Sequence, residues 1–178
     1  MISFCCLRLK RESKNKFMSS IVIFYSRTGN TQFVAETIAS VLGSELIPLK
    51  DKKKRSGALG WLLAGRDAFL ERQTEIEAVS LDLNKYDLIL LGCPNWAANL
   101  PPAIRTFLTA KDFSGKKVAL FCTQDSMGAE KVFNSLRRLA TGADIVSEKY
   151  FNKVNKNKDV VRWQIKEWLE GLNTSARG

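Results

Sequence analysis

Apolar and polar positions along the chain fall into two alternating patterns. The runs over 21–25, 86–92 and 116–122 are almost continuously apolar, as expected for strands that are buried on both faces. The stretches between these runs place apolar residues at helical spacing. The pattern predicts strands at 21–25, 45–49, 86–92, 116–122 and 143–151, alternating with helices at 31–43, 58–72, 101–110, 128–140 and 159–172.

This alternation predicts an α/β fold in which a doubly wound parallel sheet carries helices on both faces, giving three layers, α/β/α. Pro48 lacks a backbone donor, so the strand over 45–49 is expected at an edge of the sheet. Gly43 is expected to end the first helix. The buried face of that helix is expected to comprise Val34, Ile38, Val41 and Leu42.

Three loops follow the carboxyl ends of the most buried predicted strands, at 26–31, 93–100 and 123–128. In open parallel sheets, ligands bind outside the carboxyl ends of the strands, near the point where the strand order reverses. All three loops are unusual in composition, with hydroxyl and amide side chains, glycines and one Trp. If the loops share one edge of the sheet, they form one site.

The loop over 26–31, "SRTGNT", places three hydroxyl side chains around Gly29 just before a helix. Free N–H groups at a helix amino terminus favour a phosphate, and small hydroxyl residues add donors without blocking its approach. The alternative is that one of these hydroxyls simply caps the helix. The patterns GxxxxGK[ST] and GxGxxG are both absent, so a monophosphate held mainly by neutral donors remains. Arg27 either adds charge there or points to solvent.

The stretch "VIFYSRTGNTQFVA" (22–35) resembles the flavodoxin signature, and the resemblance extends over roughly 20–172. It implies a five-stranded sheet of order 2-1-3-4-5 and a flavodoxin-like FMN-binding domain over 20–174. Residues 1–19 are expected to form an extension that is either disordered or loosely attached. In this family the first loop holds the phosphate of FMN. Arg27 falls at a free position of the signature. The phosphate cradle implied by the resemblance comprises Ser26, Thr28, Gly29, Asn30 and Thr31.

The second loop, "GCPNWAANLPP" (92–102), is also similar to flavodoxins, in which it lies against the isoalloxazine ring. Trp96 in such a loop is suited to stacking. The alternative is that Trp96 covers the core beneath the loop. The expected ring-binding residues here are Pro94, Asn95, Trp96, Ala97 and Asn99.

The third loop, "TQDSMG" (123–128), departs from the family because it lacks the aromatic residue that often covers the second face of the ring. Either Met127 contacts the ring through its polarizable sulfur, or this face is open to a substrate. The segment over 52–69 is either a lid or partner contact beside the flavin or an ordinary crossover helix. The expected contacts from the third loop are Thr123, Gln124, Asp125, Met127 and Gly128.

The amino-acid composition excludes several kinds of catalytic and metal site. The chain of 178 residues has no His, which excludes Ser–His and Cys–His nucleophiles and a conventional zinc site. We therefore expect no metal and no catalytic side chain, because the flavin would carry the reaction. Of the four cysteines, Cys93 and Cys122 follow adjacent strands; they are either buried apolar groups or a redox-active pair, which would require thiolate character.

The net charge is +10, of which the first twenty residues carry +4, with five Lys and Arg against one Glu. No nucleic-acid motif is present. The excess of positive charge therefore either keeps the protein soluble or attracts an acidic protein or a membrane surface to the basic tail. Neither a secretory signal nor a membrane span is evident, and a cytoplasmic protein is expected.

We expect an FMN protein that passes electrons to a redox partner protein. The alternatives are an NAD(P)H-dependent oxidoreductase acting on a quinone or other small acceptor, a flavodoxin-like protoporphyrinogen oxidase, and a non-redox binding module.

Overall fold

The computed structural model describes residues 19–53 and 65–175. The expected extension over 1–19 lies almost wholly outside these ranges, as do Cys5, Cys6 and the first part of the helix predicted at 58–72. Within them, the predicted strands and helices are all found, with ends that differ by one or two residues in most cases.

Five strands form one parallel sheet in the order β2-β1-β3-β4-β5, which confirms the predicted fold. β2 lies at an edge, as the proline indicated. The order reverses at β1, which pairs with both β2 and β3. This reversal is where the fold is expected to bind a ligand. The strands are β1 (Ser20–Phe24), β2 (Glu45–Pro48), β3 (Leu88–Pro94), β4 (Lys117–Gln124) and β5 (Asp144–Asn152).

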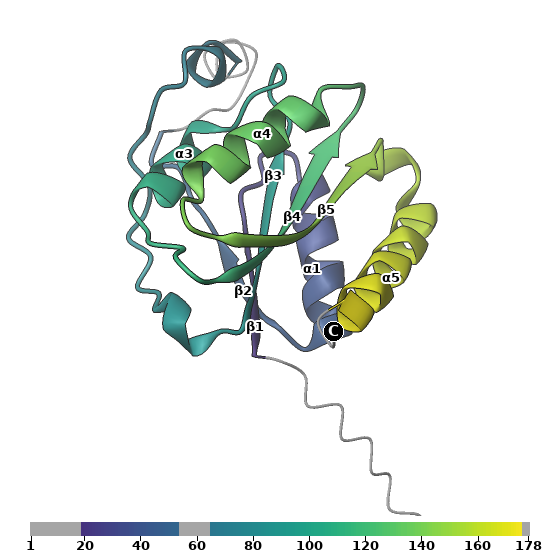
Figure 1. Cartoon of the computed structure of the whole chain (residues 1–178). Helices are drawn as coiled ribbons and strands as arrows, with labels where there is room; N and C mark the ends of the chain where they lie inside the picture. The colour runs from purple at the N-terminus through teal and green to yellow at the C-terminus, as the bar shows by residue number, and fades with distance from the viewer. Residues whose placement is uncertain (1–18, 54–64, 176–178) are drawn as a thin grey trace, which may run out of the picture.

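Helices cover both faces of the sheet (Figure 1). One apolar core lies between the sheet and the helices α3 and α4, and the other lies between the sheet and the helices α1 and α5. Side chains alternate along each strand, so Ile21 and Ile23 enter the first core while Val22 enters the second. The helices are α1 (Asn30–Leu42), α3 (Pro102–Thr109), α4 (Ala129–Leu139) and α5 (Lys158–Ser175). Two short 3₁₀ turns that the sequence pattern did not predict lie at Leu83–Lys85 and Val154–Lys156.

Two expectations about the helices were wrong. Val41 is 39% exposed, because Ala35 and Ala39 belong to the buried stripe of α1 and turn that stripe away from Val41. The helix predicted to continue to residue 72 ends at 69 within the described residues, because the chain turns at Glu71, where φ is +52°. None of the helices within 19–53 and 65–175 has the length and apolar character needed to cross a membrane.

Candidate functional site

The first loop leaves β1 and leads directly into α1. Gly29 occupies the position before the helix with φ of +87°, a conformation that favours glycine, and no side chain caps the helix. Among the described residues, the backbone N–H groups of Asn30, Thr31 and Gln32 have no acceptor. The Ser26 hydroxyl instead accepts a hydrogen bond from the N–H of Gly29 (3.2 Å). The amino terminus of α1 therefore presents three free donors at the carboxyl edge of the sheet.

A buried hydroxyl pair joins the first loop to the third. Thr31 and Thr123 are 1% and 3% exposed, and their hydroxyl oxygens lie 2.7 Å apart. One hydroxyl donates to the other, so each has a hydrogen-bond partner although both residues are almost completely buried. Thr31 therefore fixes the start of α1 relative to the end of β4.

Asn95 joins the second loop to the third. Its amide NH₂ donates to the side-chain oxygen of Gln124 (3.1 Å) and to the carbonyl of Met127 (3.0 Å). Its amide oxygen accepts from the N–H of Ala98 (2.7 Å). All of its polar atoms are thus engaged within the protein, so Asn95 shapes the site more than it supplies a free hydrogen-bonding group.

Close packing between the second and third loops depends on Gly128. Its φ is +106°, and a Cβ built at this position would lie 3.0 Å from the Cβ of Ala98 and 3.2 Å from the amide nitrogen of Asn95. Ala97 and Ala98 also have positive φ values, of 52° and 60°, which is uncommon for residues other than glycine. The second loop is therefore tightly bent where it meets the third.

Trp96 both covers the core and lines the pocket, so it has features of both alternatives that the sequence left open. It is 9% exposed and belongs to the core between the sheet and the helices α3 and α4, where its ring packs edge-on against Tyr25 (5.5 Å between centroids). It also lines the pocket described below. The guanidinium carbon of Arg27 lies 5.0 Å from the centre of the Trp96 ring, a cation–π contact. Arg27 is therefore part of the site wall.

The three loops enclose one pocket of about 270 Å³ at the carboxyl edge of the sheet. Gly65, from the segment between β2 and β3, also lines it and was not among the predicted residues. The sequence indicated this contact only through the alternative in which the segment over 52–69 forms a lid beside the flavin. The predicted residues that line the pocket are Arg27, Thr28, Asn30, Pro94, Asn95, Trp96, Ala97, Thr123, Gln124 and Asp125.

The remaining predicted residues lie near the pocket without lining it. Ser26, Gly29, Thr31 and Gly128 build its frame, as described above. Asn99 lines a neighbouring groove instead. Met127 is 82% exposed and is absent from the pocket wall, so this arrangement gives no support to the expected contact between its sulfur and a flavin ring.

Cys93 and Cys122 lie opposite each other on β3 and β4, and both are fully buried free thiols. The hydrogen bond with Cys122, followed by complete burial, raises the pKa of Cys93 well above its ordinary value. A redox-active pair would need an accessible thiolate, so the interpretation as buried apolar groups is favoured.

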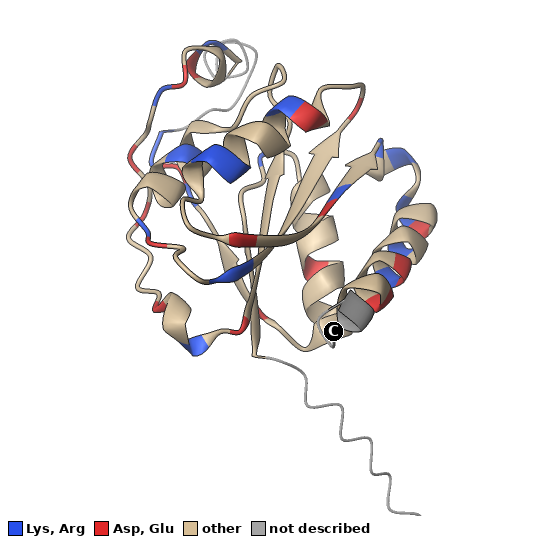
Figure 2. Ribbon diagram, in the orientation of Figure 1, with Lys and Arg blue, Asp and Glu red and all other residues tan. Residues whose placement is uncertain are grey.

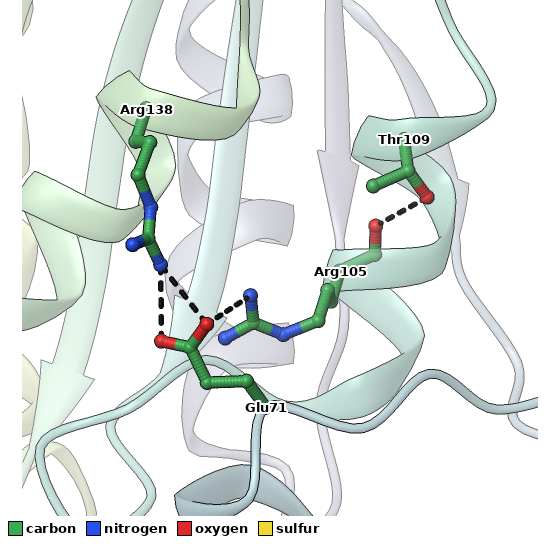
Figure 3. Close-up of polar contacts among 4 residues, drawn as sticks. All are labelled: Glu71, Arg105, Thr109 and Arg138. Atoms are coloured by element: carbon green, nitrogen blue, oxygen red, sulfur yellow. Dashed lines mark hydrogen bonds and ion pairs between the residues drawn. The ribbon is translucent and has the colours of Figure 1, made fainter.

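A buried arginine that the sequence did not single out fastens the segment after Gly65 to α3. Arg105 is 4% exposed, and its Nη1 donates to Glu71 (3.3 Å). Arg138 of α4 donates to both oxygens of the same carboxylate, at 3.0 and 3.1 Å, so Glu71 lies between two arginines (Figure 3). Within the described residues, Nε and Nη2 of Arg105 have no partner. Burial lowers the pKa of Arg105, and Glu71 opposes that shift.

Comparison with known proteins identifies the family. A family model described as flavodoxin matches residues 19–171, which is most of the chain. The chain belongs to the flavodoxin family.

Two curated flavodoxins are similar in sequence to part of this chain. The flavodoxin of Synechococcus elongatus is 32% identical over 117 residues, which cover 62% of this chain and 55% of that protein. A flavodoxin of a Nostoc species is 30% identical over 113 residues, covering 61% of this chain and 53% of that protein. The chain thus spans about half the length of the curated relatives that it matches.

Solved structures agree with the flavodoxin fold. A putative flavoprotein from Bacteroides uniformis superimposes with a TM-score of 0.73 at 24% identity, covering 86% of this chain and 98% of that one. A flavoprotein from Lactobacillus acidophilus, solved in complex with FMN, gives a TM-score of 0.64 at 24% identity and covers 83% and 99% of the two chains. At this identity the likeness shows the fold.

Proposed function

We propose that this flavodoxin-family chain binds FMN in the three-loop pocket and uses it to transfer electrons. The observation that carries the proposal is the convergence of all three loops on one pocket beside a helix amino terminus with free N–H donors. The similarity to the flavodoxin of Synechococcus elongatus and to the flavoprotein solved with FMN supports the choice of cofactor. When bound, FMN would supply the redox chemistry, and the chain would supply binding, orientation and electrostatics.

The residues at the first loop fit the phosphate end of FMN. The free N–H groups of Asn30, Thr31 and Gln32, together with the positive end of the α1 dipole, favour a dianion. Thr28 is exposed at this point and offers a hydroxyl donor. The absence of a side chain on Gly29 leaves open space in front of the helix, because a Cβ there would meet nothing within 4 Å.

The residues at the other end of the pocket fit a planar ring. Residues 94–97, which include Trp96, and residues 123–125 line this part. Arg27 covers one face of the Trp96 ring, so a flavin that stacks directly on that face would first displace the guanidinium. We therefore place the flavin ring against the second and third loops, with Arg27 close to it.

Titration of the apoprotein with FMN and with riboflavin tests the proposal. If the first loop holds the phosphate, FMN should bind at least about a hundredfold more tightly than riboflavin, which shares the ring but lacks the phosphate. Thr28→Val should weaken FMN binding and leave riboflavin binding unchanged. Equal affinities for the two flavins, or no binding of either, would contradict the proposal.

The direction of electron flow separates the main alternatives. An electron carrier should keep its bound flavin oxidised when NADPH is added, and lose its yellow absorbance only when a reductase is also present. Bleaching by NADPH alone, followed by turnover with a quinone, would instead identify an oxidoreductase. A chain that binds no flavin would be a non-redox binding module.

A further inference from the structure

A second groove adjoins the three-loop pocket on the side of α4. Its volume is about 420 Å³, and Ala97 lines both hollows. Lys131, Ser135 and Arg138 of α4 line it, and so does Phe69. We refer to this feature as the α4 groove. It is within the size range of small-molecule sites.

The α4 groove is cationic. Its lining contains the carboxylate of Glu71 against the cations Lys131 and Arg138, and Glu71 is already held by Arg138 and by the buried Arg105. Lys131 has neither an ion-pair partner nor a hydrogen-bond acceptor for its ammonium group anywhere in the described residues. Lys and Arg occur at both ends of α4 (Figure 2). An anion entering the groove would therefore meet Lys131, a cation that has no counterion among the described residues.

The same groove offers neutral donors and an apolar surface. No partner for the Ser135 hydroxyl is found among residues 19–53 and 65–175. The amide oxygen of Asn134 accepts from Arg137, which leaves its NH₂ group available as a donor. Phe69, which lines the groove, is 69% exposed, although a side chain of this size is usually covered. Exposed aromatic surface beside free donors suits an aromatic ligand with an anionic group.

We propose that the α4 groove binds a small aromatic anion, with its ring against Phe69 and its charged group at Lys131. Ala97 lines both this site and the three-loop pocket, so the ligand would lie beside the flavin. The adjacency to a flavin rests on the function proposed above, whereas binding to the groove does not.

A matched pair of ligands tests the groove directly. Naphthalene-2-sulfonate and the neutral naphthalene-2-sulfonamide have the same ring and nearly the same shape. Calorimetric titration of the full chain should show the sulfonate binding about fivefold more tightly. Lys131→Gln should abolish this preference, whereas Lys117→Gln, which makes the same charge change at the far end of β4, should retain it. Phe69→Ala should weaken both ligands. Equal binding of the two ligands by the wild type, or equal effects of the two lysine variants, would overturn the proposal.

Repeating the titration with and without FMN separates this proposal from the function proposed above. A chain that binds no FMN but keeps the Lys131-dependent preference supports the groove and refutes the proposed function. A chain that binds FMN but shows no such preference refutes the groove alone. With FMN bound, the sulfonate should also change the flavin absorbance spectrum, and the Lys131→Gln variant should require about fivefold more ligand for the same change.

Discussion

At the scale of single residues, Gly128 is a position where the contact between the second and third loops depends on the absence of a side chain. Gly128→Ala would force a residue with a Cβ to keep φ at +106° and would press that Cβ against Ala98 and Asn95. We expect a loss of about 1–2 kcal/mol in the free energy of unfolding. Because the second loop must move, we also expect about tenfold weaker FMN binding. Urea unfolding and flavin titration measure the two effects.

Gly115→Ala is the matched control. Gly115 also has a positive φ, of 69°, but a Cβ there would meet nothing within 4 Å, and it lies before β4 at the opposite edge of the sheet. This variant should lose stability through backbone strain alone and bind FMN as the wild type does. If both variants weaken FMN binding equally, the contact between Gly128 and the second loop does not shape the site.

The site residues show what the sequence could and could not predict. Loop composition was enough to predict that Thr28, Asn30 and Trp96 lie in one pocket, because the carboxyl ends of parallel strands share one edge of the sheet. It could not predict that Met127 is exposed or that the Asn95 side chain is engaged by the third loop. Those properties depend on side-chain directions in tightly bent loops, which have no periodic pattern to reveal them.

At the scale of elements, the segment after Gly65 is fastened to α3 by Glu71. Glu71→Gln keeps the shape of the side chain but removes the counterion of Arg105, which is almost completely buried. Breaking an ion pair in this way leaves an uncompensated buried charge, so we expect a loss of about 2 kcal/mol in the free energy of unfolding. Arg138→Gln removes a cation whose side chain is 61% exposed, and it should cost less than about 1 kcal/mol. Equal losses in the two variants would show that Arg105 does not depend on Glu71.

Helices and strands were predictable where the apolar periodicity is strong. They were less predictable where small or polar residues determine the buried face or the end of a helix. The buried strands and α4 were found close to their observed ends. The stripe of α1 was misplaced at Val41 because Ala35 and Ala39, which carry little hydrophobic signal, are buried. The end of the helix before Glu71 was missed because it depends on a positive φ at a residue other than glycine, which apolar periodicity does not indicate.

The buried thiol of Cys93, which lies on β3 opposite Cys122 of β4, makes the stability of the fold depend on pH. The pKa of this thiol is raised in the folded chain, so in the unfolded chain it loses its proton first. Its contribution is therefore complete below the ordinary thiol pKa of about 8.5 and is lost as the pH rises above that value. Relative to Cys93→Ala, the wild type should lose about 1.4 kcal/mol per pH unit in that range. Urea unfolding at several pH values measures the two profiles, and parallel profiles would contradict the assignment.

At the scale of the whole molecule, charge should set the reduction potential of a bound flavin. The chain carries +10, and +6 remains beyond the first twenty residues. Fully reduced FMN is anionic, so a positive protein stabilises it, whereas a negative one opposes its formation. We therefore expect a less negative potential for the second reduction step than acidic flavodoxins have. A redox titration that gave a very low potential would contradict this expectation.

The contribution of a single nearby charge can be separated from that of the net charge. Arg27 lines the three-loop pocket, whereas Lys117 lies at the amino end of β4, and replacing either with Gln removes one positive charge. At saturating FMN, Arg27→Gln should make the potential more negative by about 20 mV or more, while Lys117→Gln should change it little, because the interaction falls with distance. Raising the salt from about 0.01 M to about 1 M shortens the screening length from about 30 Å to about 3 Å. The effect of the net charge should then fade, while the effect of Arg27 should largely persist, because it acts at short range. Equal shifts in the two variants would mean that Arg27 does not lie near the flavin.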